Sequence, residues 1–225
     1  MYKCLSVVSQ AHFDLQAMVR HVELINKALE SELEKLHAIM DEETKDLDEY
    51  DLDGYFREIN DYWIETAEEL PLMQWYAQFM VAYSRFEKAL NDICKSLQSE
   101  RSLRLNLRDI YGRGIYRAKT YLTKVALLQN AFNCPEWKDV ETFALVRNII
   151  AHRNGYVEYD PENKKSDYNK ILKINNVEFD EDCLFDEWHS DTNSSKIIFR
   201  SDYVLSALKN FHVILEKIFI DLKGQ

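Results

Sequence analysis

The absence of helix-breaking residues from the first fifty positions is the feature that most constrains this fold. The first glycine is Gly54 and the first proline is Pro71. Within this stretch apolar residues recur at spacings of three and four, which predicts a helix with one apolar face. The stripe consists of Leu15, Met18, Val22, Ile25, Leu29, Leu33, Leu36 and Met40. Such a helix would be about 50 Å long at ~1.5 Å per residue, and we expect the acidic run 41–53 to end it.

The same spacing predicts further helices along the chain. One has Pro71 in its first turn, one spans 112–130, one runs from Pro135 to a stop at Gly155, and the last begins near Ser201 and Asp202. Segment 160–200 differs, because 171–174 and 196–199 are short and β-branched, which predicts a small hairpin. We therefore expect a mainly α fold, an antiparallel bundle of about five helices with a β-hairpin insert at 160–200 before the C-terminal helix. Residues 1–70 would form a long acidic helix and its connection, and 71–225 the bundle.

The composition and the motifs that are missing indicate the cellular compartment and exclude several kinds of site. Hydrophobic residues make up 46% of the chain, yet no apolar run approaches the ~18 residues of a membrane span. The four cysteines are far apart and form no C-x-x-C pair, which favours a reducing compartment, and we expect a cytoplasmic protein. H-E-x-x-H, the P-loop and G-x-G-x-x-G are all absent, so we expect neither a metal nor a cofactor.

The charge is unevenly distributed. The net charge of −11 taken alone disfavours a polyanionic partner. The segment from Arg101 to Lys124, however, contains seven basic residues and a single acidic one, Asp109. This local positive field suits a polyanion. The alternative is a solvated surface that happens to carry arginines.

The segment from Arg147 to His152 has the least ordinary pattern in the sequence. At about 100° per residue, Arg147 falls on the same helix face as a set of apolar residues. These are Val140, Phe143, Ala144, Val146, Ile150 and Ala151. A guanidinium on a core-facing stripe needs a partner or a cleft, since an unpaired charge is costly to bury.

The neighbours of Arg147 suggest two readings of this helix. Asn148 and His152 are four residues apart and share one side, where the carboxamide can orient the imidazole. Leu145 and Ile149 are predicted to lie roughly opposite the core stripe, where they can pack on a second copy of the protein. In the alternative reading the helix is central in the bundle, and buried carboxylates neutralise Arg147 and His152.

The pattern R-N-x-x-x-H, placed late in a helix of an all-helical chain, resembles the HEPN superfamily. That superfamily includes toxins of toxin–antitoxin pairs, antiphage effectors and ribonuclease parts of some CRISPR effectors. The resemblance covers about residue 71 to the C-terminus. It implies a metal-independent endoribonuclease whose two motifs face each other across the cleft of a homodimer. Arg147 would neutralise the scissile phosphate, His152 would act as general acid or base, and Asn148 would hold the local geometry.

The chemistry is consistent with the resemblance. Cleavage by the RNA's own 2′-hydroxyl needs one proton removed and one supplied, which histidine can do near neutral pH, while a guanidinium stabilises charge on the phosphoryl oxygens. One toxin group carries a modifiable tyrosine two residues after the histidine. Here that residue is Asn154, so such regulation is not expected. Tentative RNA contacts are Arg101, Arg104, Arg108, Arg113, Arg117, Lys119 and Arg153.

The expected partners are therefore RNA, a second copy of the chain and an antitoxin or defence-system protein, with no membrane. A second function remains open at this point. The chain can instead be a non-catalytic helical module that binds a partner protein in a defence or regulatory complex, with Arg147 and His152 only structural.

Overall fold

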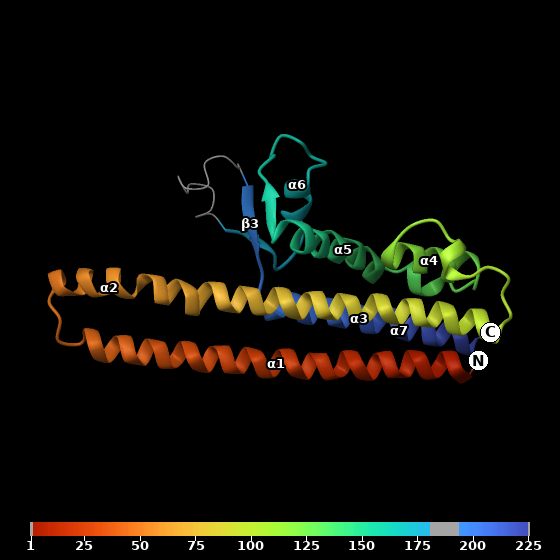
Figure 1. Ribbon diagram of the computed structural model, residues 1–225, viewed down its shortest axis with the longest axis horizontal. Helices are drawn as coiled ribbons and strands as arrows, with labels where there is room; N and C mark the ends of the chain where they lie inside the picture. Colours follow the sequence, from red (N-terminus) through yellow and green to blue (C-terminus); the bar gives the residue numbers. More distant parts are fainter. Residues whose placement is uncertain (1, 181–193, 225) are drawn as a thin grey trace.

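Three long helices lie side by side and form the body of the molecule. The computed structural model describes residues 2–180 and 194–224. Helix α1 (Tyr2–Thr44) runs antiparallel to both α3 (Leu70–Glu100) and α7 (Ser201–Lys223), so that both chain ends lie at the same end of the molecule (Figure 1). The prediction of a mainly α fold with a small β element before the C-terminal helix is confirmed.

The acidic run ends α1 at Thr44, as predicted, but its second half is helical. The carboxylate of Asp48 accepts hydrogen bonds from the backbone N–H groups of Tyr50 and Asp51 and so caps α2 (Glu49–Ile64). A π-helical turn, η1 (Glu65–Glu69), and α3 follow directly. Pro71 therefore lies in the first turn of a helix, as predicted, although no loop separates α3 from the helical residues before it. A proline is tolerated in the first turn of α3, and the wider π turn interrupts the regular hydrogen bonding just before it.

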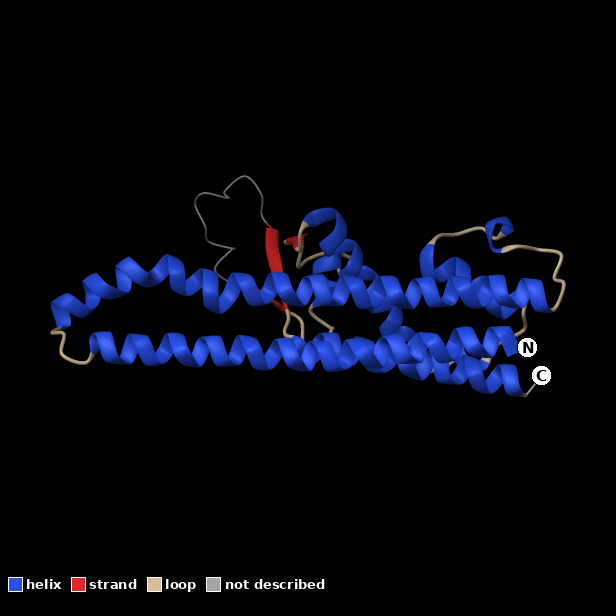
Figure 2. Ribbon diagram, turned by 60° about the horizontal axis from the view of Figure 1, so that its bottom comes forward, coloured by secondary structure: helices blue, strands red, loops and turns tan. Residues whose placement is uncertain are grey.

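The hydrophobic core lies at the end of the molecule that carries the termini. The first half of α1 packs there against α3 and α7, and five aromatic rings meet between α3, α5 (Pro135–Arg153) and α7. These are Phe79, Phe86, Phe143, Tyr203 and Phe211. Beyond Val22, α1 buries only Leu36, and α2 buries no residue. The outer half of α1 and α2 thus extend as an arm beyond the core (Figure 2).

Helix α4 (Gly114–Lys124) and the three-stranded sheet complete the fold. The predicted helix 112–130 ends early, because Leu127 has a positive φ of 61° and a 3-10 turn, η3 (Asn130–Phe132), follows. Another 3-10 turn, η2 (Leu107–Asp109), precedes α4. Strand β3 (Ser194–Ile198) pairs antiparallel with β1 (Tyr156–Glu158) on one side and with β2 (Glu178–Phe179) on the other.

Only one of the two predicted strands forms. The prediction for 196–199 is confirmed by β3 up to Ile198. The prediction for 171–174 is wrong, because Ser166 caps a short helix, α6 (Asp167–Ile171), by accepting a hydrogen bond from the N–H of Asn169. The partners of β3 are β1 and β2 instead, and residues 181–193 of the predicted insert lie outside the described residues. Among the residues described, no helix is long and apolar enough to cross a membrane.

Candidate functional site

Helix α5 carries the R-N-x-x-x-H segment and is more deeply packed than its sequence suggests. Val140, Phe143, Ala144 and Val146 are buried, as predicted. Ile149 is also buried, at 2% exposure, so its predicted place on an outer face is wrong. Its burial follows from the neighbours of α5, which packs against α3, α7 and strand β1 and is covered over a wide arc.

Two further residues of α5 correct the predicted faces. Ala151, expected in the core, is exposed. Leu145, expected on an outer apolar face, is half-buried and packs against the core of its own chain. The outer apolar face predicted for a second copy is therefore largely used within the chain.

Arg147 lies at the edge of the core beside α3. Its side chain is half-buried, and the guanidinium carbon is 5.6 Å from the centre of the Tyr83 ring. Its Nη1 donates a hydrogen bond of 2.9 Å to the Asn148 side-chain oxygen. Within the described residues no carboxylate forms an ion pair with Arg147, so the alternative of a buried carboxylate partner is not what the structure shows.

Arg147 opens onto a hollow on the outer side of α3. The hollow has a volume of about 320 Å³ and is lined, besides Arg147, by polar residues of α3. They recur at helical spacing: Ser84, Glu87, Lys88, Asn91, Asp92 and Lys95. The carboxylate of Asp92 pairs with both lysines, at 3.3 Å in the case of Lys95. Arg147 is thus the cation of this hollow that no described carboxylate pairs with.

His152 and Asn148 lie on the exposed side of α5. Both side chains are exposed, and their four-residue spacing places them on one side of the helix. No hydrogen bond or ion pair of His152 is found in the described part of the chain. His152 is five positions after Arg147, which corresponds to a rotation of about 140° around the helix. Within one chain, therefore, the two side chains do not converge on a single point.

Glu87 is the residue of this region that the sequence alone did not place. It lies on α3 and lines the same hollow as Arg147, and its carboxylate oxygens lie 3.6 Å from where a Cβ on Gly114 would be. A detectable signal existed, since polar residues recur every three or four positions opposite the apolar seam of α3. The spacing of the polar residues along α3 does not indicate which helix packs beside them.

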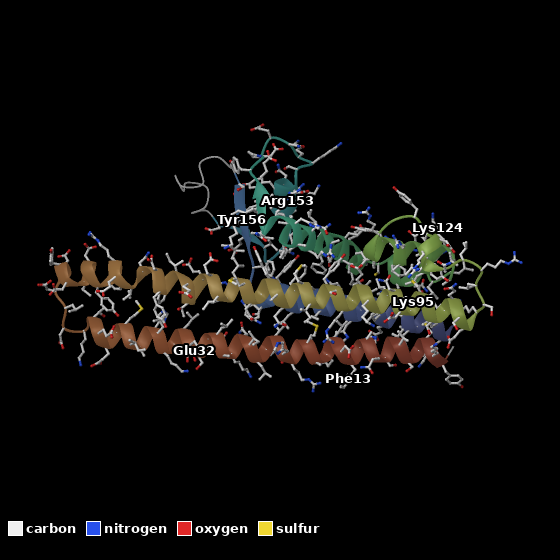
Figure 3. All side chains as sticks on the ribbon, in the orientation of Figure 1. Phe13, Glu32, Lys95, Lys124, Arg153 and Tyr156 are labelled. Carbon is white, nitrogen blue, oxygen red and sulfur yellow. The ribbon has the colours of Figure 1, made fainter. Side chains whose placement is uncertain are left out.

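The predicted RNA contacts divide into exposed and internally engaged residues. Arg104, Arg108 and Arg113 are exposed. The other four have partners within the chain. Arg101 and Arg117 donate hydrogen bonds to backbone carbonyls, of Ala126 at 3.1 Å and of Gly112 at 2.7 Å. Lys119 and Arg153 form ion pairs, with Glu141 at 3.1 Å and with Asp167 at 3.2 Å. In Figure 3, Arg153 lies at the sheet end of α5 and Lys124 toward the end with the chain termini.

A second cluster joins α1 to α7. The Nδ1 atoms of His12 and His212 lie 2.9 Å apart, and the ring centres are 5.2 Å apart. Burial lowers the pKa of both imidazoles below the ordinary value of 6.5; Glu216 partly counteracts this at His12, whereas His12 lowers that of His212 further. The pair is therefore neutral near pH 7, one ring donating an N–H to the other. Over the described ranges, no three His, Cys, Asp or Glu side chains are grouped to hold a metal ion.

Comparison with known protein families, with curated proteins and with solved structures finds no match for this chain.

Proposed function

We propose that this protein is a metal-independent endoribonuclease, acting as a toxin or antiphage defence effector. The observation that carries the proposal is the state of Arg147. Its guanidinium is held over an aromatic ring at the edge of an open hollow, with no carboxylate partner among the described residues, and His152 is exposed five positions further along the same helix. A cation placed in this way is free to receive a phosphate.

Each residue of the motif has a distinct task in this proposal. Arg147 binds the scissile phosphate and stabilises the charge that develops on its oxygens. His152 takes a proton from the 2′-hydroxyl or supplies one to the leaving 5′-oxygen. Asn148 accepts a hydrogen bond from Arg147 and so limits the positions of the guanidinium.

The proposal requires two subunits. Arg147 and His152 diverge on one helix, and a single histidine does not serve both proton transfers at once. A homodimer brings a second motif to the same phosphodiester and supplies the second imidazole. An antitoxin or a defence-system protein is the proposed regulator of such an activity.

The direct test is RNA cleavage by purified protein. We expect His152→Ala and Arg147→Ala each to lower the rate by about 10²-fold or more, with EDTA leaving the wild-type rate unchanged. The matched controls are His21→Ala and Arg57→Ala, at exposed positions of α1 and α2, which should cleave like wild type. Cleavage that requires added divalent metal, or that survives both motif substitutions, would refute the proposal.

A non-catalytic binding module is the second candidate, and the arm favours it. Ile39, Phe56 and Tyr62 are 54%, 49% and 59% exposed on α1 and α2, so this part of the molecule presents apolar side chains to solvent. Expression of wild type and His152→Ala in a bacterial host separates the two functions. Growth inhibition by wild type alone supports the ribonuclease, and equal growth of both strains supports the binding module.

A further inference from the structure

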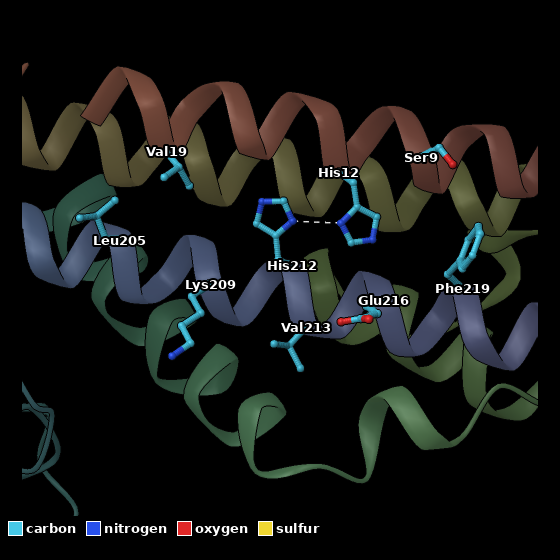
Figure 4. A pocket seen from close by; sticks show the side chains of 9 residues that line it. All are labelled: Ser9, His12, Val19, Leu205, Lys209, His212, Val213, Glu216 and Phe219. Atoms are coloured by element: carbon cyan, nitrogen blue, oxygen red, sulfur yellow. Dashed lines mark hydrogen bonds between the residues drawn. The ribbon is translucent and has the colours of Figure 1, made fainter. Parts of the chain in front are cut away.

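A second hollow, larger than the one beside Arg147, lies between α1 and α7. It has a volume of about 750 Å³, and Ser9, His12 and Val19 of α1 form one wall (Figure 4). The other wall is the outer side of α7, with Leu205, Lys209, His212, Val213, Glu216 and Phe219. The walls are mostly apolar at the two ends and carry the histidine pair in the middle.

The outer residues of α7 form one straight stripe. At about 100° per residue, Leu205, Lys209, Glu216 and Ile220 lie within about 30° of a common line along the helix, with His212 and Val213 on either side of it. Lys209, Glu216 and Ile220 are exposed, the last at 59%. In the described part of the chain neither Lys209 nor Glu216 forms an ion pair.

The stripe is complementary to itself when reversed. About a two-fold axis between residues 212 and 213, Lys209 of one helix falls opposite Glu216 of an antiparallel copy, and Leu205 falls opposite Ile220. Each pairing occurs twice. Lys209 meets an anion, and Leu205 meets another apolar side chain. A two-fold interface requires such self-complementarity.

We propose that a second copy of this chain packs antiparallel against the α1/α7 groove, with the two α7 helices crossing at residues 212 and 213. The apolar residues at each end leave water, which supplies the main driving force. The two Lys209–Glu216 pairs fix the antiparallel direction and the register, because a parallel or shifted arrangement loses them. The partly buried, neutral His12–His212 pair forms the floor at the axis and places no charge there near pH 7.

This interface is distinct from the pairing required by the proposed ribonuclease site. Helix α5 packs against α3 and α7 but lies away from α1 (Figure 1). Two copies joined through α7 therefore do not bring their Arg147 residues together. The inference goes beyond the proposed function and stands or fails without it.

Charge reversal tests the interface on the full-length protein. Sedimentation velocity across a concentration series should give a wild-type dimer of twice 26.7 kDa, or a larger assembly where the pairing required by the proposed ribonuclease site also forms. Lys209→Glu or Glu216→Lys alone creates two like-charge contacts and should raise the dimer Kd by about tenfold. The double variant K209E/E216K restores both pairs with reversed sign, and its Kd should return to within about threefold of wild type. Lys138→Glu, at an exposed position of α5, is the matched control.

Crosslinking tests the register. Within one chain, residues 205 and 220 are about 22 Å apart along α7 at ~1.5 Å per residue, so cysteines placed at both cannot join each other. The double variant L205C/I220C should form a covalent dimer under mild oxidation, and neither single variant should do so at the same rate. A monomer at all concentrations, a dimer unaffected by the charge reversals, or failure of the double reversal to restore it would overturn the inference. A dimer broken by Ala151→Arg, at an exposed position of α5, but not by Glu216→Lys would also overturn it.

Discussion

Arg147 is held at the edge of the core by Tyr83, whose ring centre lies 5.6 Å from the guanidinium carbon. Tyr83 is 4% exposed and belongs to α3, so the contact fixes Arg147 over the polar side of that helix. A guanidinium above an aromatic face is stabilised without the loss of its positive charge. This contact explains how α5 carries an arginine on a largely apolar side without a carboxylate partner among the described residues.

Substitution of Tyr83 should separate the aromatic face from the hydroxyl. Tyr83→Phe keeps the ring, and we expect RNA cleavage within about twofold of wild type. Tyr83→Leu removes the ring and should lower cleavage by about two- to fivefold, corresponding to ~0.5–1 kcal/mol for the cation–π contact. Thermal unfolding of both variants provides the control, with rates compared well below either midpoint. Equal rates for the phenylalanine and leucine variants would show that the ring does not position Arg147.

The histidine pair should make the stability depend on pH. Both imidazoles have a pKa lowered by burial, so the folded chain binds these protons less readily than the unfolded chain does. The free energy of unfolding should therefore be highest above pH 6.5 and fall as the pH drops from 6.5 through the lowered pKa values. Lys209 and Glu216 also line this groove, and Glu216 opposes the effect at His12.

Urea denaturation at a series of pH values measures this dependence. His212→Gln removes one of the two groups and should flatten the decline between pH 6.5 and the lowered pKa range. His21→Gln is the control, because His21 is exposed on α1 and should leave the curve unchanged. An unaltered decline in the His212 variant would mean that other groups cause it.

Gly155 should be the least replaceable glycine of the described chain. It has a φ of +90°, and a Cβ there would overlap the hydroxyl of Tyr76. Gly155→Ala should lower the free energy of unfolding by about 3 kcal/mol, from backbone strain and overpacking together. Gly54→Ala is the matched control, since Gly54 is helical with nothing within 4 Å, and alanine there should stabilise slightly. Similar midpoints in urea for both variants would contradict this account.

RNA binding should depend on the exposed arginines before α4. We expect the double variant R104E/R108E to weaken binding of an RNA oligonucleotide and to lower the slope of log K against log salt by about two, near one per phosphate contact. Arg101→Gln is a less direct probe, because Arg101 already bonds the carbonyl of Ala126. A salt slope that does not change in the double variant would remove this surface from the proposed RNA path.

The sequence predicted elements whose ends are marked locally. Pro135 opens α5 and Gly155 lies just beyond its end, as expected, although the left-handed cap that ends the helix is Asn154, with a φ of 50°. Helix α7 likewise begins at the predicted Ser201. The short helix α6 was missed because Ile171 and Ile174 suggest a strand, whereas the cap at Ser166 decides the local structure.

The site was only partly predictable, because its geometry depends on packing between helices. The spacing placed Arg147 within the apolar set, but which residue meets its guanidinium depends on the register of α3 against α5. The same limitation applied to Ile149, which β1 and the neighbouring helices help to bury. The histidine pair joins residues separated by 200 positions, and no local pattern in the chain relates them.

The chemistry of the RNA ends after cleavage tests the central claim most directly. A defined RNA oligonucleotide is incubated with purified wild type, Arg147→Ala and His152→Ala in the presence of EDTA, and the products are analysed by mass spectrometry. The account predicts fragments that end in a 2′,3′-cyclic phosphate with wild type and intact RNA with either variant. Intact RNA with wild type, 3′-hydroxyl ends, or the same fragments with His152→Ala would contradict it.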